Sequence, residues 1–437
     1  MEKKKGSIDE NTLATYGRRY IILILLCAST LTSSFQVYEQ TSIGNVIVDY
    51  YSVTYIAVSW TANLNTIPNI LLFYYIGKFI NSYGLRKTML AATFLCAVGS
   101  IIKCAALDRD HFWLLIIAKI FPCFLNVIFF YLAPVLAANW FKPNEAGLVI
   151  ATVNALFAIG MCATFSLPIL FKDASIDEIK KLFLTSSITC VLIYVALFCL
   201  IMLIVVDKPP TPPSLAAKKR SESESTKLKI LISNRNFVLV SMITLFVFGF
   251  TQVFPLSLNE SILSNFKANE GKDRILSLCG TLYLVFKFFG GFISPSIVRK
   301  YPKYKLILLL YLISTLLFTT LYLLSLSLAC EWLLYASVAA LGIVFSGFIV
   351  LIIDYAIEAS FPFPESISVG IIYMTYSVSA LILTQIVTIL AQMFDTLCAY
   401  YVFVFVQAAA ILLSMFLTEE LNRRKANCEE SDVQIKV

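Results

Sequence analysis

Apolar residues form twelve long runs along the chain, and polar or charged residues gather in the segments between them. A bilayer core of about 30 Å needs about 20 apolar residues per helix, which matches these runs. The pattern predicts spans at 20–46, 52–76, 88–107, 112–137, 146–170, 182–206, 236–258, 275–297, 305–328, 331–357, 366–390 and 397–418. We therefore expect an all-α integral membrane protein with twelve transmembrane helices.

One hydrophilic segment, 207–235, is longer than the other connections and separates the first six spans from the last six. Its prolines stop the preceding helix, and its charged, serine-rich remainder has little apolar surface to bury. The chain should thus consist of an N-terminal tail, a six-helix bundle, a linker, a second six-helix bundle and a C-terminal tail. These parts have the boundaries 1–19, 20–206, 207–235, 236–418 and 419–437.

The composition agrees with a membrane protein, because 59% of the residues are hydrophobic and only 14% are charged. Soluble domains have about 45–50% apolar and about 25% charged residues. The chain contains one histidine, His111, and its cysteines form no Cys-x-x-Cys pair. Metal-binding clusters need several such ligands, so we expect no metal site, no cofactor and no catalytic residues.

Lysine and arginine gather in both tails and in every second connection, whereas the other connections are mixed or acidic. The positive-inside rule then places both termini in the cytoplasm and requires an even number of spans. The net charge of +7 is explained by this topology and does not indicate a nucleic-acid partner. A sequon at Asn259 falls on the expected outer side, where it is either glycosylated or too close to the membrane to be modified.

The segment after the second span runs from Gly77 through Gly84 to Arg86 and Lys87 and is similar to the loop pattern of the major facilitator superfamily. Glycine allows two helices to approach, and the basic pair can reach helix C-termini or carboxylates. The second half repeats the pattern in its corresponding connection. We expect a conformational latch made of Gly77, Gly84, Arg86, Lys87, Arg299, Lys300, Asp354, Glu358 and Glu365, in which the carboxylates meet Arg299 or Lys300. The alternative is that these charges only set the topology.

More specific stretches lie at 34–45, 138–145, 208–214 and 354–370. Together they resemble the feline leukaemia virus subgroup C receptor-related transporters, a branch of the major facilitator superfamily, over about residues 33 to 420. The resemblance implies the major facilitator fold, and it implies transport of choline and ethanolamine, with haem transport also claimed for the family. It places the family's choline-site tryptophan at Val37, a tyrosine at Gln252 and a glutamine near Ala158.

Aromatic rings hold a quaternary ammonium ion, each with about 0.5–2 kcal/mol. Without the tryptophan, an aromatic cage must be rebuilt from Tyr38, Tyr373 or Tyr376, or the substrate differs. Polar residues inside apolar spans usually face a cavity or a partner helix. The candidates for substrate binding are Gln36, Tyr38, Glu39, Gln40, Asn126, Asn154, Gln252, Tyr373, Tyr376 and Gln385.

Glu39 can attract a cation or take up a proton, unless it lies at the outer interface. Lys103, Lys119 and Lys287 are long enough to extend toward the membrane surface.

These observations favour a monomeric carrier in the plasma membrane that moves choline or a related organic cation by alternating access. Haem or another metabolite is the alternative substrate. A receptor or scaffold that kept the transporter fold is the alternative class. A polar central cavity would favour the carrier, and a cavity filled with Phe and Leu would favour the scaffold.

Overall fold

The computed structural model describes residues 16–54, 57–58, 61, 64–164, 167–171, 174–211, 231–265, 272–394, 396–419 and 421–428. These residues form helices and short turns and include no strand. The first half contains α1 (Arg18–Ser42), α2 (Gly44–Tyr51), α4 (Ile67–Ala105), α5 (Phe112–Trp140), α6 (Ala146–Thr164), α7 (Leu167–Leu170) and α8 (Ile176–Ile204), with 3-10 turns η2 (Arg109–His111) and η3 (Pro143–Glu145). The second half contains α11 (Arg235–Val247), α12 (Phe250–Asn265), α13 (Lys272–Lys300), α14 (Tyr304–Ser327), α15 (Glu331–Ser360), α16 (Glu365–Met393), α17 (Thr396–Met415) and α18 (Asn422–Cys428).

Nine helices of the described residues are long and apolar enough to cross a membrane. The helix α4 has 39 residues and supplies two crossings, because its backbone leaves the helical conformation at Gly84. The shorter helices α11 and α12 together form one interrupted crossing, and α17 forms another. The described residues are thus compatible with the twelve crossings that the apolar runs predict.

The helices differ from the expected spans mainly at their ends. The segment 77–87 was expected to be a loop, but it is helical except at Gly84, where the backbone has φ 78° and ψ −179°. A residue with a side chain rarely adopts this φ, so the glycine allows the chain to turn within a single residue. Most of the expected linker, residues 212–230, lies outside the described residues.

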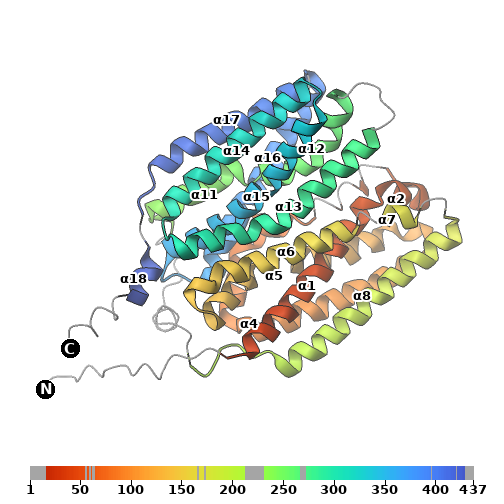
Figure 1. Cartoon of the computed structure of the whole chain (residues 1–437). Coiled ribbons are helices and arrows are strands. Elements are labelled where there is room, and N and C mark those ends of the chain that lie inside the picture. Colours follow the sequence, from red (N-terminus) through yellow and green to blue (C-terminus); the bar gives the residue numbers. More distant parts are fainter. Residues whose placement is uncertain are drawn as a thin grey trace.

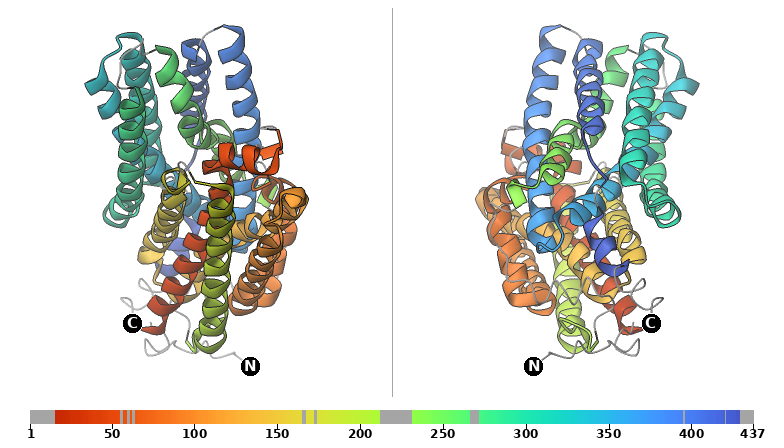
Figure 2. Two further views of the ribbon diagram at one scale, coloured as in Figure 1. Left: turned by 90° about the vertical axis from the view of Figure 1, so that its right-hand side faces the viewer. Right: turned by 90° about the vertical axis from the view of Figure 1, so that its left-hand side faces the viewer.

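The helices form two bundles, α1–α8 and α11–α17, which lie one above the other in Figure 1. Figure 2 shows the same two groups from two other sides. Across the interface, α16 contacts α4 and α5, while α13 contacts α6. A cluster of buried apolar side chains includes residues of both bundles, such as Tyr131 and Ile367.

The bundles are pressed together at the end where α18 lies, which we call the α18 end. A Cβ atom added to Gly77 of α4 would be 3.0 Å from the Cα of Ile367 in α16. The Ser366 hydroxyl donates a hydrogen bond of 2.9 Å to the Gly77 carbonyl oxygen. Only glycine permits this backbone approach, so Gly77 belongs to a tight contact between the bundles.

Candidate functional site

A cavity of about 80 Å³ lies between the two bundles. The helices α5, α6, α13 and α15 contribute residues from the middle of their length, namely Asn126, Asn154, Lys287 and Ser346. The lining residues are Tyr38, Asn65, Asn69, Asn126, Val127, Phe130, Asn154, Phe157, Ala158, Phe248, Thr251, Lys287, Ser346, Ile349, Tyr373 and Tyr376. We call this space the central cavity.

Several residues expected to bind substrate line the central cavity. They are Tyr38, Asn126, Asn154, Tyr373 and Tyr376. The side chain of Gln252 lies outside the described residues, although its neighbour Thr251 lines the cavity. The side chain of Asn259, the glycosylation candidate, is also outside the described residues.

Glu39, expected in the binding site, points away from the cavity into the first bundle. The Lys103 amine of α4 lies 2.6 Å from both carboxylate oxygens of Glu39, and the Ser186 hydroxyl of α8 donates to one of them at 2.9 Å. The Glu39 residue is only 2% exposed, so its carboxylate is enclosed by the helices of the first bundle. Its charge is neutralised by Lys103 and is not available to attract a substrate.

Three further candidates also lie elsewhere. The Gln36 amide donates to the Ser100 hydroxyl at 2.6 Å inside the first bundle, and the neighbouring Gln40 is buried. Successive helical residues are rotated by about 100°, so Tyr38 faces the cavity while Gln36, Glu39 and Gln40 face other helices. Gln385 is exposed on α16 and does not line the cavity.

Carboxamides form one wall of the central cavity. The Ser33 hydroxyl donates to the Asn126 amide oxygen at 3.0 Å, and the Asn126 amide nitrogen donates to Asn65 at 3.5 Å. The Asn154 amide nitrogen donates to the Ile150 carbonyl at 2.9 Å. These bonds fix the orientation of the amides and leave part of their hydrogen-bonding capacity for a solute.

Aromatic rings from both bundles form the rest of the wall. In the first bundle Tyr38 and Phe130 both contact Phe157, with centroid distances of 5.8 and 4.8 Å. In the second bundle Phe248 and Tyr376 have centroids 4.5 Å apart. Such rings offer apolar surface and faces that attract cations.

The central cavity is closed toward the α18 end by a contact between the bundles. The rings of Tyr131 in α5 and Tyr373 in α16 stack with centroids 5.8 Å apart. The Tyr131 hydroxyl lies 3.2 Å from the Asn69 amide oxygen and 3.4 Å from the Gly370 carbonyl oxygen. The single hydroxyl proton can be donated to one of these oxygens at a time. The stacked rings join α5 to α16, so a solute cannot leave this way unless the bundles separate.

The carboxylates at the end of α15 contact α18. They do not contact Arg299 or Lys300, which were expected from the sequence to be their partners. The Arg423 guanidinium lies 3.0 Å from Glu358 and 3.5 Å from Asp354, and it donates to the Pro143 carbonyl of the first bundle at 3.4 Å. Burial lowers the pKa of Arg423, but the carboxylates of Glu358 and Asp354 raise it by more, so its charge is retained. From the sequence, Arg423 was expected only to contribute to the topology, as one of the basic residues of the C-terminal tail.

The expected partners Arg299 and Lys300 are exposed at the end of α13. The Lys300 amine lies 5.3 Å above the Tyr301 ring. The expected pairing with Asp354 and Glu358 is therefore wrong, because Arg423 fills the buried space beside these carboxylates. Glu365 is buried at the start of α16.

The turn at Gly84 is held by Asp207, which follows α8. The Asp207 carboxylate accepts a hydrogen bond of 2.7 Å from the Arg86 backbone nitrogen, and the Arg86 guanidinium donates to the Met202 carbonyl at 2.8 Å. Arg86 therefore contacts a carbonyl of the last turn of α8, where a cation is favourable. Lys87, the other basic residue of this motif, is exposed.

We expect Gly84→Ala to destabilise the protein by about 1–3 kcal/mol, since a side chain at positive φ is strained. The added Cβ would also lie 2.5 Å from the Asp207 carboxylate. Thermal melting of the detergent-purified variant measures the loss. Gly280→Ala is the matched control, because a Cβ there meets nothing within 4 Å. Equal melting temperatures for the two variants would contradict the expectation.

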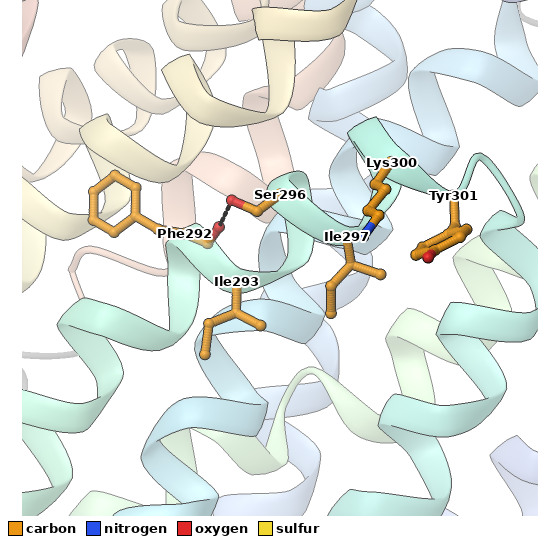
Figure 3. A pocket seen from close by; sticks show the side chains of 6 residues that line it. All are labelled: Phe292, Ile293, Ser296, Ile297, Lys300 and Tyr301. Atoms are coloured by element: carbon orange, nitrogen blue, oxygen red, sulfur yellow. Dashed lines mark hydrogen bonds between the residues drawn. The ribbon is translucent and has the colours of Figure 1, made fainter.

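A second hollow of about 470 Å³ lies along α13 and is lined by one stretch of chain, Phe292 to Tyr301. Figure 3 shows its side chains, with Ser296 donating to the Phe292 carbonyl at 2.7 Å. Phe292 is half-buried, whereas Ile293, Ser296, Ile297, Lys300 and Tyr301 are exposed. The hollow is thus a surface feature of one helix, whereas the central cavity gathers polar groups from both bundles.

Comparison with known proteins gives one family. The profile described as Major Facilitator Superfamily matches residues 21–366. An uncharacterized MFS-type transporter of Caenorhabditis elegans, C09D4.1, is 23% identical over 94% of this chain and 71% of its own length. The choline/ethanolamine transporter FLVCR2 of Rattus norvegicus is also 23% identical, over 98% of this chain and 79% of its own.

Solved structures agree in fold. The fucose:proton symporter FucP of E. coli superposes with a TM-score of 0.71 at 12% identity, covering 92% of this chain and 99% of its own. A bacterial homologue of the iron transporter ferroportin, in an outward-facing state, has a TM-score of 0.65 at 14% identity. It covers 90% of this chain and 98% of its own.

Proposed function

Since the chain belongs to the Major Facilitator Superfamily, we propose that it carries a small organic solute across a membrane by alternating access. The observation that carries this proposal is the central cavity, which has polar and aromatic walls drawn from both bundles. Rocking of one bundle against the other would expose it to each side in turn. Its four asparagines also argue for a carrier and against a scaffold with a filled interior.

Choline, ethanolamine or a related organic cation is the proposed solute. Relatives such as the choline/ethanolamine transporter FLVCR2 of rat support these molecules. The rings of Tyr38, Tyr373 and Tyr376 provide faces for an ammonium group, in place of the tryptophan that is absent at Val37. Haem is not favoured as the solute. The cavity volume of about 80 Å³ is smaller than the volume of about 300–1,000 Å³ that is usual for sites of drug-sized ligands.

We place the α18 end in the cytoplasm of the cell and the protein in the plasma membrane as a monomer. Lysine and arginine residues of both tails support this orientation through the positive-inside rule. The rocking units would be residues 20–206 and 236–418, joined by the linker 207–235. In the arrangement described here, Arg423 would act as a cytoplasmic latch, together with Gly77 and the carboxylates of α15.

Uptake of radiolabelled choline and ethanolamine into proteoliposomes tests this proposal. We expect saturable uptake, and we expect Tyr376→Leu to raise the KM for choline about 2- to 30-fold through the loss of one aromatic face. Gln385→Leu on the same helix is the control and should leave KM unchanged, because Gln385 does not line the cavity. Uptake that does not saturate for either solute would overturn the proposal.

A further inference from the structure

Lys287 lies in the middle of the membrane-spanning helix α13 and lines the central cavity. At 1.5 Å per residue, its Cα is about 20 Å from either end of α13. Extension of the side chain cannot bring the amine to the membrane surface over this distance. The expectation that Lys287 reaches the surface is therefore wrong, and its charge must be stabilised inside the protein.

The described surroundings of Lys287 provide no counter-ion. The lining of the central cavity contains no aspartate or glutamate among the described residues. The Lys287 amine lies 5.4 Å from the centroid of the Tyr283 ring, and no described carboxylate is within ion-pair distance. Glu39, the buried carboxylate of the first bundle, is already paired with Lys103. The cavity therefore holds an amine without a counter-ion among the residues that the structure describes.

A buried unpaired charge is unfavourable, and intramembrane charges usually mark a substrate pathway. Neutral hydrogen-bonding groups accompany Lys287 in the cavity, including the amides of Asn126 and Asn154 and the hydroxyls of Thr251 and Ser346. Amide and hydroxyl donors beside a lysine can bind the oxygens of a carboxylate or phosphate. An anionic group of a bound solute can therefore act as the counter-ion of Lys287.

We propose that Lys287 binds an anionic group of the transported solute. The solute then carries a carboxylate or phosphate in addition to the ammonium group that faces the aromatic rings. This inference rests on the proposed carrier function. It changes the proposed substrate class from simple cations to molecules that carry both an ammonium group and an anionic group. A simple cation such as choline leaves Lys287 unpaired and adds a second positive charge to the cavity.

Three probes with the same trimethylammonium group test the proposal: choline, glycine betaine with a carboxylate, and phosphocholine with a phosphate. Uptake of each into proteoliposomes is measured for the full chain. We expect betaine or phosphocholine to have a KM about 10- to 150-fold below that of choline, as a hydrogen bond to a charged group implies. Which of the two is preferred distinguishes a carboxylate from a phosphate.

Two variants isolate the charge. Lys287→Met should remove the preference for the anionic probes, because their KM values rise toward that of choline, whereas Lys287→Arg should retain the preference. Lys287→Met should also raise the melting temperature of the ligand-free protein, because an uncompensated buried charge is lost. A lowered melting temperature would show that the lysine is stabilised by the protein itself and would overturn the proposal.

The outcomes separate the two proposals. Saturable choline uptake with a KM below those of betaine and phosphocholine would overturn the anion site and leave the carrier function standing. If the wild-type preference for the anionic probes persisted in Lys287→Met, the anion site would also be overturned, and the carrier function would stand. Lack of saturable uptake for all three probes would overturn both.

Discussion

Replacing Glu39 with glutamine is expected to destabilise the first bundle by about 3–5 kcal/mol, the usual cost of removing one partner of a buried ion pair. Lys103 would keep its charge beside a neutral amide, with its side chain only 8% exposed. Lys119, a buried lysine of α5 whose amine has no described hydrogen-bond partner, also interacts with the Glu39 charge. The loss is measured as a lower melting temperature of the detergent-purified protein.

A second change should reverse most of this effect. In Glu39→Gln with Lys103→Met, no charge of the pair remains buried, so the double variant should melt above Glu39→Gln alone. Asp108→Asn is the matched control, because Asp108 also pairs with a lysine, Lys180 at 2.9 Å, but in exposed surroundings. That change should have a much smaller effect. A double variant less stable than Glu39→Gln would contradict the ion-pair explanation.

Arg423→Gln is expected to open the α18 end of the protein. The ion pairs with Glu358 and Asp354 lie within the second half of the chain, so their loss mainly lowers stability, by about 3–5 kcal/mol. The hydrogen bond to the Pro143 carbonyl joins the two bundles. A bond from a charged donor contributes about 1.5–3 kcal/mol, so its loss should shift the equilibrium between closed and open states about 10- to 150-fold.

Spin labels at Lys87 and Arg299 measure this opening, since both residues are exposed at the α18 end of different bundles. The distance distribution in Arg423→Gln should shift toward longer values at a temperature where the variant remains folded. Lys425→Gln removes the same charge from the same helix without a buried contact and should leave the distribution unchanged. Equal distributions in both variants would exclude Arg423 from the latch.

The fold was predictable from hydropathy because apolar length and the alternation of basic connections are properties of the whole chain. Its twelve crossings follow from these signals alone. The turn at Gly84 was not predictable in detail, since a single residue with positive φ replaces the expected loop. Arg423 lies far from Glu358 in sequence, and only the folded chain shows that they meet.

The types of residue in the site were predictable from the sequence. Which of them face the cavity was not predictable, because that depends on the rotation of each helix about its axis. Tyr38 and Glu39 are adjacent, yet one lines the cavity and the other is paired with Lys103. A single sequence does not fix which face of α1 meets the cavity, because polar residues occur on both faces. Lys287 could have been found from its depth, since it lies thirteen positions before the end of its helix at Lys300.

The position of Arg423 in the chain has a consequence for biosynthesis. Ribosomes add this residue only after the residues of α1–α17 have been joined, so the contact with Pro143 cannot help either bundle during membrane insertion. Each bundle must therefore be held by its own contacts at that stage. The ion pair of Glu39 with Lys103 is such a contact in the first bundle. The hydrogen bond of 3.1 Å from Gln407 to Thr319 is one in the second bundle. The Arg423 contact that closes the α18 end can therefore form only after the residues of both bundles have been joined.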